Sequence, residues 1–123
     1  MSLNRVMLIG RLCSDPEMSY TPGGHQVTPL RLATNRTLTS QDGNRREESE
    51  FHDIVVWGKA AEAVAQHTRK GAQVYIEGRL QTRSWEQDGM KRYKTEVVAE
   101  QVRFLGRARE LEPELRQEQT VAQ

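Results

Sequence analysis

The stretch EFHDIVVWGK, residues 50–59, decides the fold because it reads as a half-buried strand that passes directly into a helix. Side chains alternate between the two faces of a strand, so Ile54 and Val56 are predicted to face a core. The opposite face carries the odd-numbered residues Phe51, Asp53, Val55 and Trp57. Aromatic rings on one sheet face, with cations near them, suit the stacking of successive unpaired bases. The same rings equally suit packing against a second sheet or another subunit.

The residues that follow predict a short helix and then a second strand. Residues 59–68, KAAEAVAQHT, are mostly strong helix formers, and the next three residues, RKG, supply cations and a stop. Residues 72–82 alternate again. The predicted inner face of this strand carries Val74, Ile76, Gly78, Leu80 and Thr82, and the odd face continues through Tyr75, Arg79, Arg83 and Trp85. This order favours an all-β fold, a five-stranded barrel with one short helix between strands 3 and 4.

Three further strands complete the predicted barrel, over residues 4–13, 26–35 and 93–105. The first has apolar residues on both faces, with Met7 and Ile9 on the outside, which suggests that a second copy of the chain covers it. Gly10 indicates a bend or a close approach of two backbones, and Pro29 indicates an edge or a bulge. In the last strand the side chains predicted for the core are Val97, Val98 and Val102.

Two connections stand out between the predicted strands. Residues 37–50 contain almost no apolar side chains, so they are interpreted as a long, mobile hairpin loop with a functional role. Residues 86–91, EQDGMK, are predicted to form a second hairpin with Asp88 and Gly89 at its tip. Residues 107–123 are charged and interrupted by Pro113, which is typical of a flexible tail. The chain is therefore divided into a domain over 1–106 and a tail over 107–123.

Length and composition limit the class of protein. A chain of 123 residues, 36% of them hydrophobic, suffices for one domain with a single core. The mean hydropathy of -0.77 and the lack of a long apolar run predict no membrane span, and the first residues lack a signal-peptide layout. The single Cys13 cannot form an intramolecular disulfide, which fits a reducing compartment. We therefore expect a cytoplasmic protein.

Catalytic and metal-binding patterns are weak. His25, His52 and His67 are scattered without the spacing of metal ligands, and neither a phosphate-binding loop nor a dinucleotide fingerprint is present. We expect no enzyme activity and no cofactor. The net charge of +1 is a mild argument against a nucleic-acid partner, so the placement of individual cations has to carry that case.

Several segments occur in an order that is highly specific when they are taken together. They are NRVMLIGRL followed by DPE, LAT at residues 32–34, EFHDIVVWGKAAE, RKGAQVYIEGRLQTRSW and RYKTEVVAEQVRFLG. From residue 4 to residue 105 the chain resembles the bacterial and mitochondrial single-stranded DNA-binding proteins, which have an OB-fold core. The resemblance implies sequence-independent binding and protection of single-stranded DNA in replication, recombination and repair.

The resemblance also implies the site residues and the assembly. It places base-stacking sites at Phe51, Trp57 and Trp85, and phosphate contacts at Lys59, Lys70 and Arg83. Arg79, on the same predicted strand face as Arg83, completes the nucleic-acid-binding set. The family further implies a homotetramer in which first strands pair between subunits, with His52 near a subunit contact.

Three positions depart from the family's pattern. Leu38 stands where the family often has a tryptophan, so a stacking platform is missing there. Asp53 occupies a position that is often basic, which weakens the local positive potential. Residues 107–123 lack the acidic tip ending in phenylalanine through which many members recruit repair and replication enzymes, so we do not expect such recruitment.

Two rival functions fit the same aromatic face. One is an OB-fold protein–protein adaptor, such as an accessory subunit of a primosome, that uses the rings to bind a protein partner. The other is RNA binding, which shares the physics of stacking and phosphate contacts. Direct competition between DNA and RNA separates the second rival from the main hypothesis.

Overall fold

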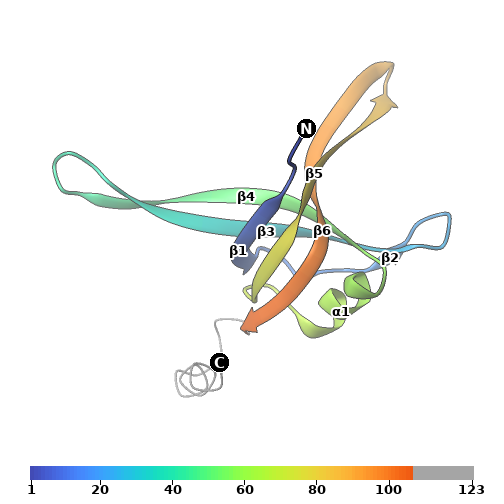
Figure 1. The fold of residues 1–123 in the computed structure, drawn as a ribbon, viewed down its shortest axis with the longest axis horizontal. Coiled ribbons are helices and arrows are strands. Elements are labelled where there is room, and N and C mark those ends of the chain that lie inside the picture. The colour runs from blue at the N-terminus through green and yellow to red at the C-terminus, as the bar shows by residue number, and fades with distance from the viewer. Residues whose placement is uncertain (107–123) are drawn as a thin grey trace.

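The computed structural model describes residues 1–106, which form a closed barrel with one helix (Figure 1). The barrel strands are β1 (Val6–Leu12), β3 (Gln26–Thr39), β4 (Arg45–Trp57), β5 (Gln73–Gln87) and β6 (Met90–Gly106). A two-residue strand, β2 (Ser19–Tyr20), pairs with β3, and helix α1 (Lys59–His67) lies between β4 and β5. The predicted all-β barrel, with its short helix between the third and fourth barrel strands, is confirmed. The predicted tail, residues 107–123, lies outside the described residues.

Backbone pairing runs around the barrel in the order β1, β5, β6, β4, β3 and returns from β3 to β1. The strands pair antiparallel except β4 and β6, which are parallel, with Ile54 beside Val97. The predicted edge position of Pro29 follows from this pairing, because Pro29 lies between the β3 residues that pair with β1 and those that pair with β2. A proline there removes no hydrogen bond to either strand.

The barrel interior is filled by alternating apolar side chains and closed at one end by α1. The core cluster consists of Leu12, Leu30, Leu32, Ile54, Val56, Ala61, Val64, Ala72, Val74, Ile76 and Val97. The helix contributes Ala61 and Val64 to this cluster. The fully buried hydroxyl of Thr28 donates a hydrogen bond of 2.9 Å to the carbonyl of Ala61, which ties β3 to the helix. Among residues 1–106 no helix is long and apolar enough to cross a membrane.

Two glycines allow neighbouring strands to approach closely. A Cβ atom on Gly10 would lie 2.3 Å from the carbonyl oxygen of Ala33, which confirms the predicted close approach. A Cβ atom on Gly78 would lie 2.0 Å from the carbonyl oxygen of Val98. The nearest atom in each case belongs to the backbone, so neither clash can be relieved by rotating a side chain.

Replacing Gly78 with alanine is therefore expected to lower the free energy of unfolding by about 1–3 kcal/mol, the usual cost of overpacking. Urea unfolding measures the change as a lower midpoint at an unchanged slope. Gly106→Ala is the matched control, because a Cβ atom there would lie 3.9 Å from Oε1 of Gln73, an ordinary contact. Equal midpoints for the two variants would contradict the close approach assigned to Gly78.

The prediction of a long loop over residues 37–50 is wrong, although the predicted hairpin is present. β3 and β4 stay paired as far as Thr39 and Arg45, and they project from the barrel as a two-stranded ribbon (Figure 1). The turn is confined to residues 40–44, where the Ser40 N–H donates to the Asn44 carbonyl at 2.9 Å. Both faces of the ribbon are largely solvent-exposed, so its strands lack the apolar alternation by which a half-buried strand is recognised. Within the turn, the Ser40 hydroxyl and the Asn44 N–H hold the pKa of Asp42 below its ordinary value.

β5 and β6 also continue beyond the barrel, as a second arm that ends in the predicted hairpin. Asp88 and Gly89 have φ values of 54° and 76°, the conformation of a tight two-residue turn that suits an Asp-Gly pair. Leu80 was predicted to face the core, but it is half-exposed because β5 leaves the barrel after Gly78. The arm therefore has two solvent-facing sides.

Candidate nucleic-acid interface

The outward sides of β3, β4, β6 and β5 form one continuous surface, here called the outer face. Residues directly opposite each other on neighbouring strands share a face of the sheet. Arg31 on β3 is opposite Asp53 on β4, Val55 on β4 is beside Val98 on β6, and Val98 is opposite Arg79 on β5. Val98, predicted for the core, therefore lies on this outer face. The outer face includes Arg31, Phe51, Asp53, Val55, Trp57, Arg79, Arg83, Trp85, Arg92, Lys94, Glu96 and Val98.

Three aromatic rings on the outer face are partly open to solvent. Phe51 is 54% exposed, Trp57 45% and Trp85 37%. Phe51 and Trp57 belong to β4, and Trp85 belongs to the β5–β6 arm, so the rings follow the face from the barrel to the arm. A ring that is packed on one side and open on the other can accept an unpaired base by stacking. The structure thus brings the three predicted stacking residues onto one surface, while their binding role stays a prediction.

Two of these rings lie beside an arginine. Cζ of Arg31 is 5.1 Å from the ring centroid of Phe51, and Cζ of Arg83 is 4.9 Å from that of Trp85. A guanidinium at this distance is attracted to the π-electrons of the ring. Arg31 was not among the predicted site residues, although its outward position in the strand is readable from the sequence. Its contact with Phe51 depends on the register between β3 and β4, which the sequence does not reveal.

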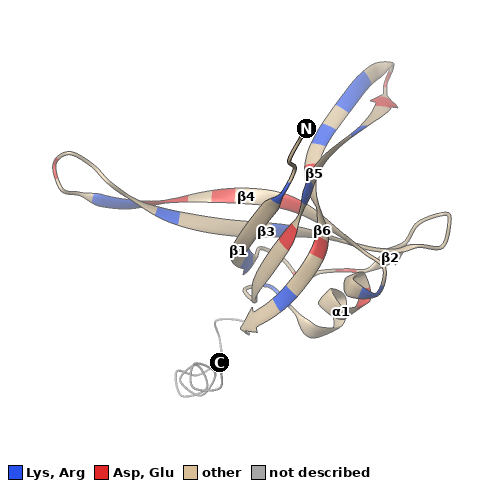
Figure 2. Ribbon diagram, viewed as in Figure 1, with Lys and Arg blue, Asp and Glu red and all other residues tan. Residues whose placement is uncertain are grey.

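Three cations of the β5–β6 arm are paired with carboxylates. Arg79 Nε is 3.9 Å from Glu100, Arg83 Nε is 2.9 Å from Glu96, and Lys94 Nζ is 3.6 Å from Asp53. The pairs of Arg79 and Lys94 are solvent-exposed and contribute little to stability, so a phosphate can compete for these two cations. Figure 2 shows basic residues along the arm with acidic residues at its tip, and both signs of charge along the β3–β4 ribbon. Local cations, rather than the net charge, therefore give the arm its basic character.

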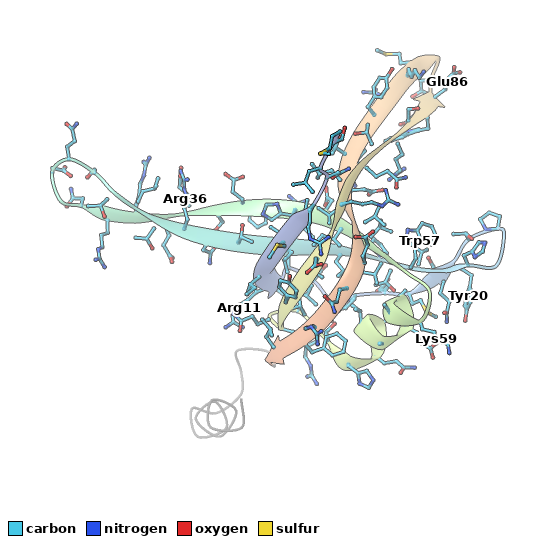
Figure 3. All side chains as sticks on the ribbon, viewed as in Figure 1. Arg11, Tyr20, Arg36, Trp57, Lys59 and Glu86 are labelled. Atoms are coloured by element: carbon cyan, nitrogen blue, oxygen red, sulfur yellow. The ribbon has the colours of Figure 1, made fainter. Side chains whose placement is uncertain are left out.

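The two predicted lysines differ in position. Lys59 is the first residue of α1 and lies just beyond Trp57, at the end of the outer face (Figure 3). Lys70 lies on the loop between α1 and β5, where its backbone N–H donates a 2.7 Å hydrogen bond to Asp15. The next residue in that loop, Gly71, donates its N–H to the carbonyl of Leu12 at the end of β1. The fold therefore places Lys59 beside the outer face and Lys70 beside the end of β1, just before β5 begins.

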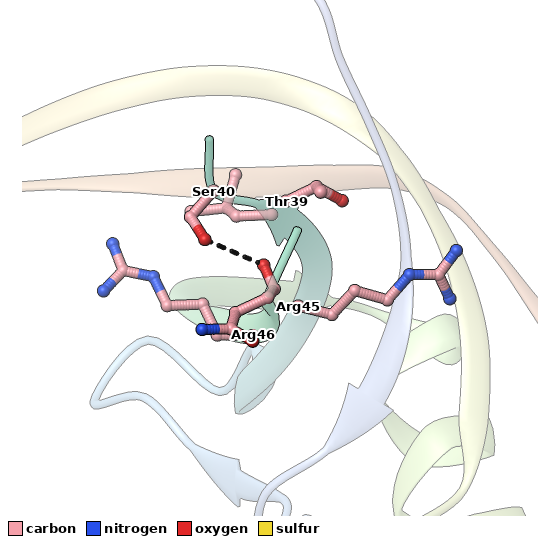
Figure 4. A pocket seen from close by; sticks show the side chains of 6 residues that line it. Thr39, Ser40, Arg45 and Arg46 are labelled. Carbon is pink, nitrogen blue, oxygen red and sulfur yellow. Dashed lines mark hydrogen bonds between the residues drawn. The ribbon is translucent and has the colours of Figure 1, made fainter. Parts of the chain in front are cut away.

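The β3–β4 ribbon offers no aromatic platform at its tip. Leu38 lies opposite Arg46 in the pairing, and both line a shallow pocket together with Thr39, Ser40, Asn44 and Arg45. The Arg45 and Arg46 side chains point away from each other, so their positive charges do not lie together in the pocket (Figure 4). The expectation that Leu38 leaves a stacking position empty stays a prediction.

Histidine and cysteine side chains do not form a reactive cluster within residues 1–106. Nε2 of His52 forms a 2.8 Å hydrogen bond with the Thr34 hydroxyl, so this ring nitrogen already has a partner. No group of three or more His, Cys, Asp or Glu side chains in this part of the chain is arranged to hold a metal ion. The predicted subunit contact of His52 stays a prediction.

The closed barrel, the helix between its third and fourth strands and the aromatic outer face define an OB-fold domain. The Single-strand binding protein family matches residues 3–105 of the chain. The chain belongs to this family.

Two curated relatives share about half of their aligned residues with this chain. Single-stranded DNA-binding protein 1 of Chlorobaculum tepidum is 49% identical over 106 residues, which cover 85% of this chain and 65% of the relative. Single-stranded DNA-binding protein 2 of Listeria monocytogenes is 50% identical over 104 residues, which cover 84% of this chain and 64% of the relative. The chain thus spans just under two thirds of the length of these relatives.

Two solved structures share the fold. A deletion mutant of the single-stranded DNA-binding protein from Thermus aquaticus matches with a TM-score of 0.74 at 40% identity, over 84% of this chain and 50% of that one. The Plasmodium falciparum protein in complex with single-stranded DNA matches with a TM-score of 0.75 at 31% identity, over 85% of this chain and 96% of that one.

Proposed function

We propose that this protein binds and protects single-stranded DNA without sequence preference, in replication, recombination and repair. The observation that carries the proposal is the continuous outer face, on which Phe51, Trp57 and Trp85 are all half-open to solvent. Membership of the family and the similarity to a relative solved with single-stranded DNA support it. The proposal is for a binding protein rather than an enzyme.

Binding in this proposal combines two physical terms. Stacking on the three rings is tolerant of sequence, because every base has a π-face. Lys59, Arg79 and Arg83 supply contacts to phosphate, which release counterions and make the affinity fall as salt rises. Arg79 exchanges its exposed carboxylate partner, Glu100, for a phosphate when DNA binds, so part of the electrostatic gain is offset.

Titration with oligo-dT is expected to quench most of the tryptophan fluorescence, since both tryptophans of the chain, Trp57 and Trp85, lie on the outer face. Duplex DNA of equal length is expected to change the emission little, because its bases are already stacked on each other. Emission spectra recorded against increasing oligonucleotide check both expectations. Equal quenching by duplex, or none by oligo-dT, would overturn the proposed function.

We also propose that the protein assembles as a homotetramer. Met7 and Ile9 point outward from β1 and are exposed, although each is a large apolar side chain. Covering this strand with a second copy removes that apolar surface from water. Several barrels in one assembly then give a single DNA strand many stacking sites at high effective concentration.

Multi-angle light scattering at micromolar concentration is expected to report four copies of the chain. Ile9→Lys is expected to shift the population towards smaller species, because it places a charge at the centre of the apolar surface of β1. Tyr20→Lys is a matched control at another exposed ring, on β2 rather than β1. A wild-type monomer would remove the assembly proposal and leave single-strand binding by the barrel intact.

The remaining proposal concerns location. We propose that the protein acts in the cytoplasm, in keeping with a single free thiol at Cys13. Fractionation of cells that produce the full protein tests this location.

A further inference from the structure

Three side chains on the β5–β6 arm contact one another in series. Glu96 accepts a hydrogen bond of 2.9 Å from Nε of Arg83, and the guanidinium of Arg83 lies 4.9 Å from the ring of Trp85. The Glu96 side chain is only 14% exposed, whereas that of Arg83 is 51% exposed. The carboxylate of Glu96 is thus largely shielded from solvent, whereas the ring of Trp85 is the group that stacks on a base in the proposed function.

The geometry of the hydrogen bond leaves Arg83 with free donors. A guanidinium carries five N–H groups in a rigid plane, and the contact with Glu96 uses the one on Nε. Fixing Nε fixes the whole plane, while the two Nη groups stay available. A two-stranded ribbon alone gives a side chain little support. Trp85 lies on such a ribbon, so the orientation of its ring depends on its neighbours, of which Arg83 is one.

We propose that Glu96 is a positioning residue of the binding interface. Its carboxylate holds Arg83 over one face of Trp85, so that the ring keeps a set orientation and offers its other face to a base. The inference rests on the proposed function, because it assigns a role within that interface. Glu96 touches no DNA in this arrangement and acts through Arg83.

A second ion pair on the same arm, between Arg79 and Glu100, serves as the comparison for the Arg83–Glu96 pair. Arg79 Nε lies 3.9 Å from Glu100, and both side chains are about half-exposed, at 45% and 55%. Arg79 also donates to Gln81, and no ring contact within residues 1–106 involves Arg79. Removing either glutamate deletes one negative charge, which by itself favours binding of an anionic strand. Loss of Glu96 therefore weakens DNA binding only if Glu96 positions Arg83 and Trp85.

The test compares Glu96→Ala and Glu96→Gln with Glu100→Ala and Glu100→Gln in the full chain, by titration with labelled oligo-dT at fixed salt. We expect Glu96→Ala to weaken binding about two- to fivefold, the size of one exposed cation–π contact, and Glu96→Gln to weaken it less. The Glu100 variants are expected to leave the affinity unchanged or to raise it. Tighter binding by the Glu96 variants, equal to that of the Glu100 variants, would overturn the proposal.

A second readout does not involve DNA. In a Trp57→Phe background Trp85 is the sole tryptophan, and acrylamide quenching of its fluorescence measures the access of a neutral probe to the ring. We expect Glu96→Ala and Arg83→Ala each to increase this quenching, and the double variant to increase it no further, because both changes break the same series. Fully additive increases, or none for Glu96→Ala, would overturn the positioning role.

The two readouts also separate this inference from the proposed function. If the wild-type protein does not bind oligo-dT, the proposed function fails, and the acrylamide measurement alone still decides whether Glu96 orients the Arg83 and Trp85 pair. Circular dichroism verifies that each variant is folded. Should Glu96→Ala fail to fold, Glu96→Gln carries both measurements.

Discussion

Replacing Trp57 with alanine is expected to weaken binding of oligo-dT by about 1–3 kcal/mol, the usual contribution of one base stacked on an aromatic side chain. The ring is 45% exposed on the outer face, so a base can reach it without movement of the barrel. The contact surface for that base is lost with the ring, whereas the core beneath β4 stays filled. Fluorescence anisotropy of labelled oligo-dT measures the change without relying on tryptophan emission.

Phe104→Ala is the matched control for Trp57→Ala. Phe104 is also 45% exposed, but it lies opposite Val74 at the α1 end of β6 and contacts the ring of His67, with 6.2 Å between the ring centroids. Because this ring lies away from the outer face, its loss is expected to change the affinity by less than about twofold, far below the effect of losing a stacked base. Equal losses for the two variants would show that exposure alone, rather than the outer face, governs the effect.

Replacing Ile54 with alanine is expected to lower the free energy of unfolding by about 2–5 kcal/mol, the range for truncating a large buried aliphatic side chain. Ile54 is 1% exposed and lies in the core beside Val97 of β6, at the parallel contact that joins β4 to the arm strand. The cavity left there removes packing from the pairing that makes the outer face continuous. Urea unfolding followed by circular dichroism measures the loss.

Affinity provides the second half of this test. At a temperature where the Ile54→Ala protein is still folded, oligo-dT is expected to bind within about threefold of wild type, because Ile54 packs in the core and every side chain of the outer face is retained. A large loss of affinity with unchanged stability would contradict the separation of β4 into a core side and a binding side. Ile54 and Trp57 thus test the two faces of one strand.

The sequence was sufficient for the central elements of the fold. Ile54 and Val56 alternate with the aromatic residues of β4, and a nine-residue helix follows directly, as the run of helix formers predicted. These signals are local, since alternation and helix propensity depend on neighbours within a few residues. The same locality explains the confirmed turn at Asp88 and Gly89, whose positive φ values are a property of the two residues themselves.

The sequence was insufficient where the structure departs from a half-buried strand. The sequence of the β3–β4 ribbon predicts a loop because its exposed faces carry no apolar alternation, although its backbone is fully paired. Alternation predicts Leu80 in the core because it continues along β5 after the strand has left the barrel, where Leu80 is half-exposed. In both cases pairing between backbones, which is independent of side-chain polarity, decided the conformation.

By itself the sequence determined that this protein is an all-β barrel with a short helix, and it determined which residues carry rings and cations. Tertiary structure alone decided which of those residues meet. The parallel register of Val55 with Val98 joins the barrel strands to the arm, and thereby brings Lys94 within 3.6 Å of Asp53. Arg31 reaches Phe51 through the register of β3 with β4, whereas Lys70 is held near β1. The reason is physical: local patterns set the faces of each strand, but strand register depends on long-range packing of the whole barrel.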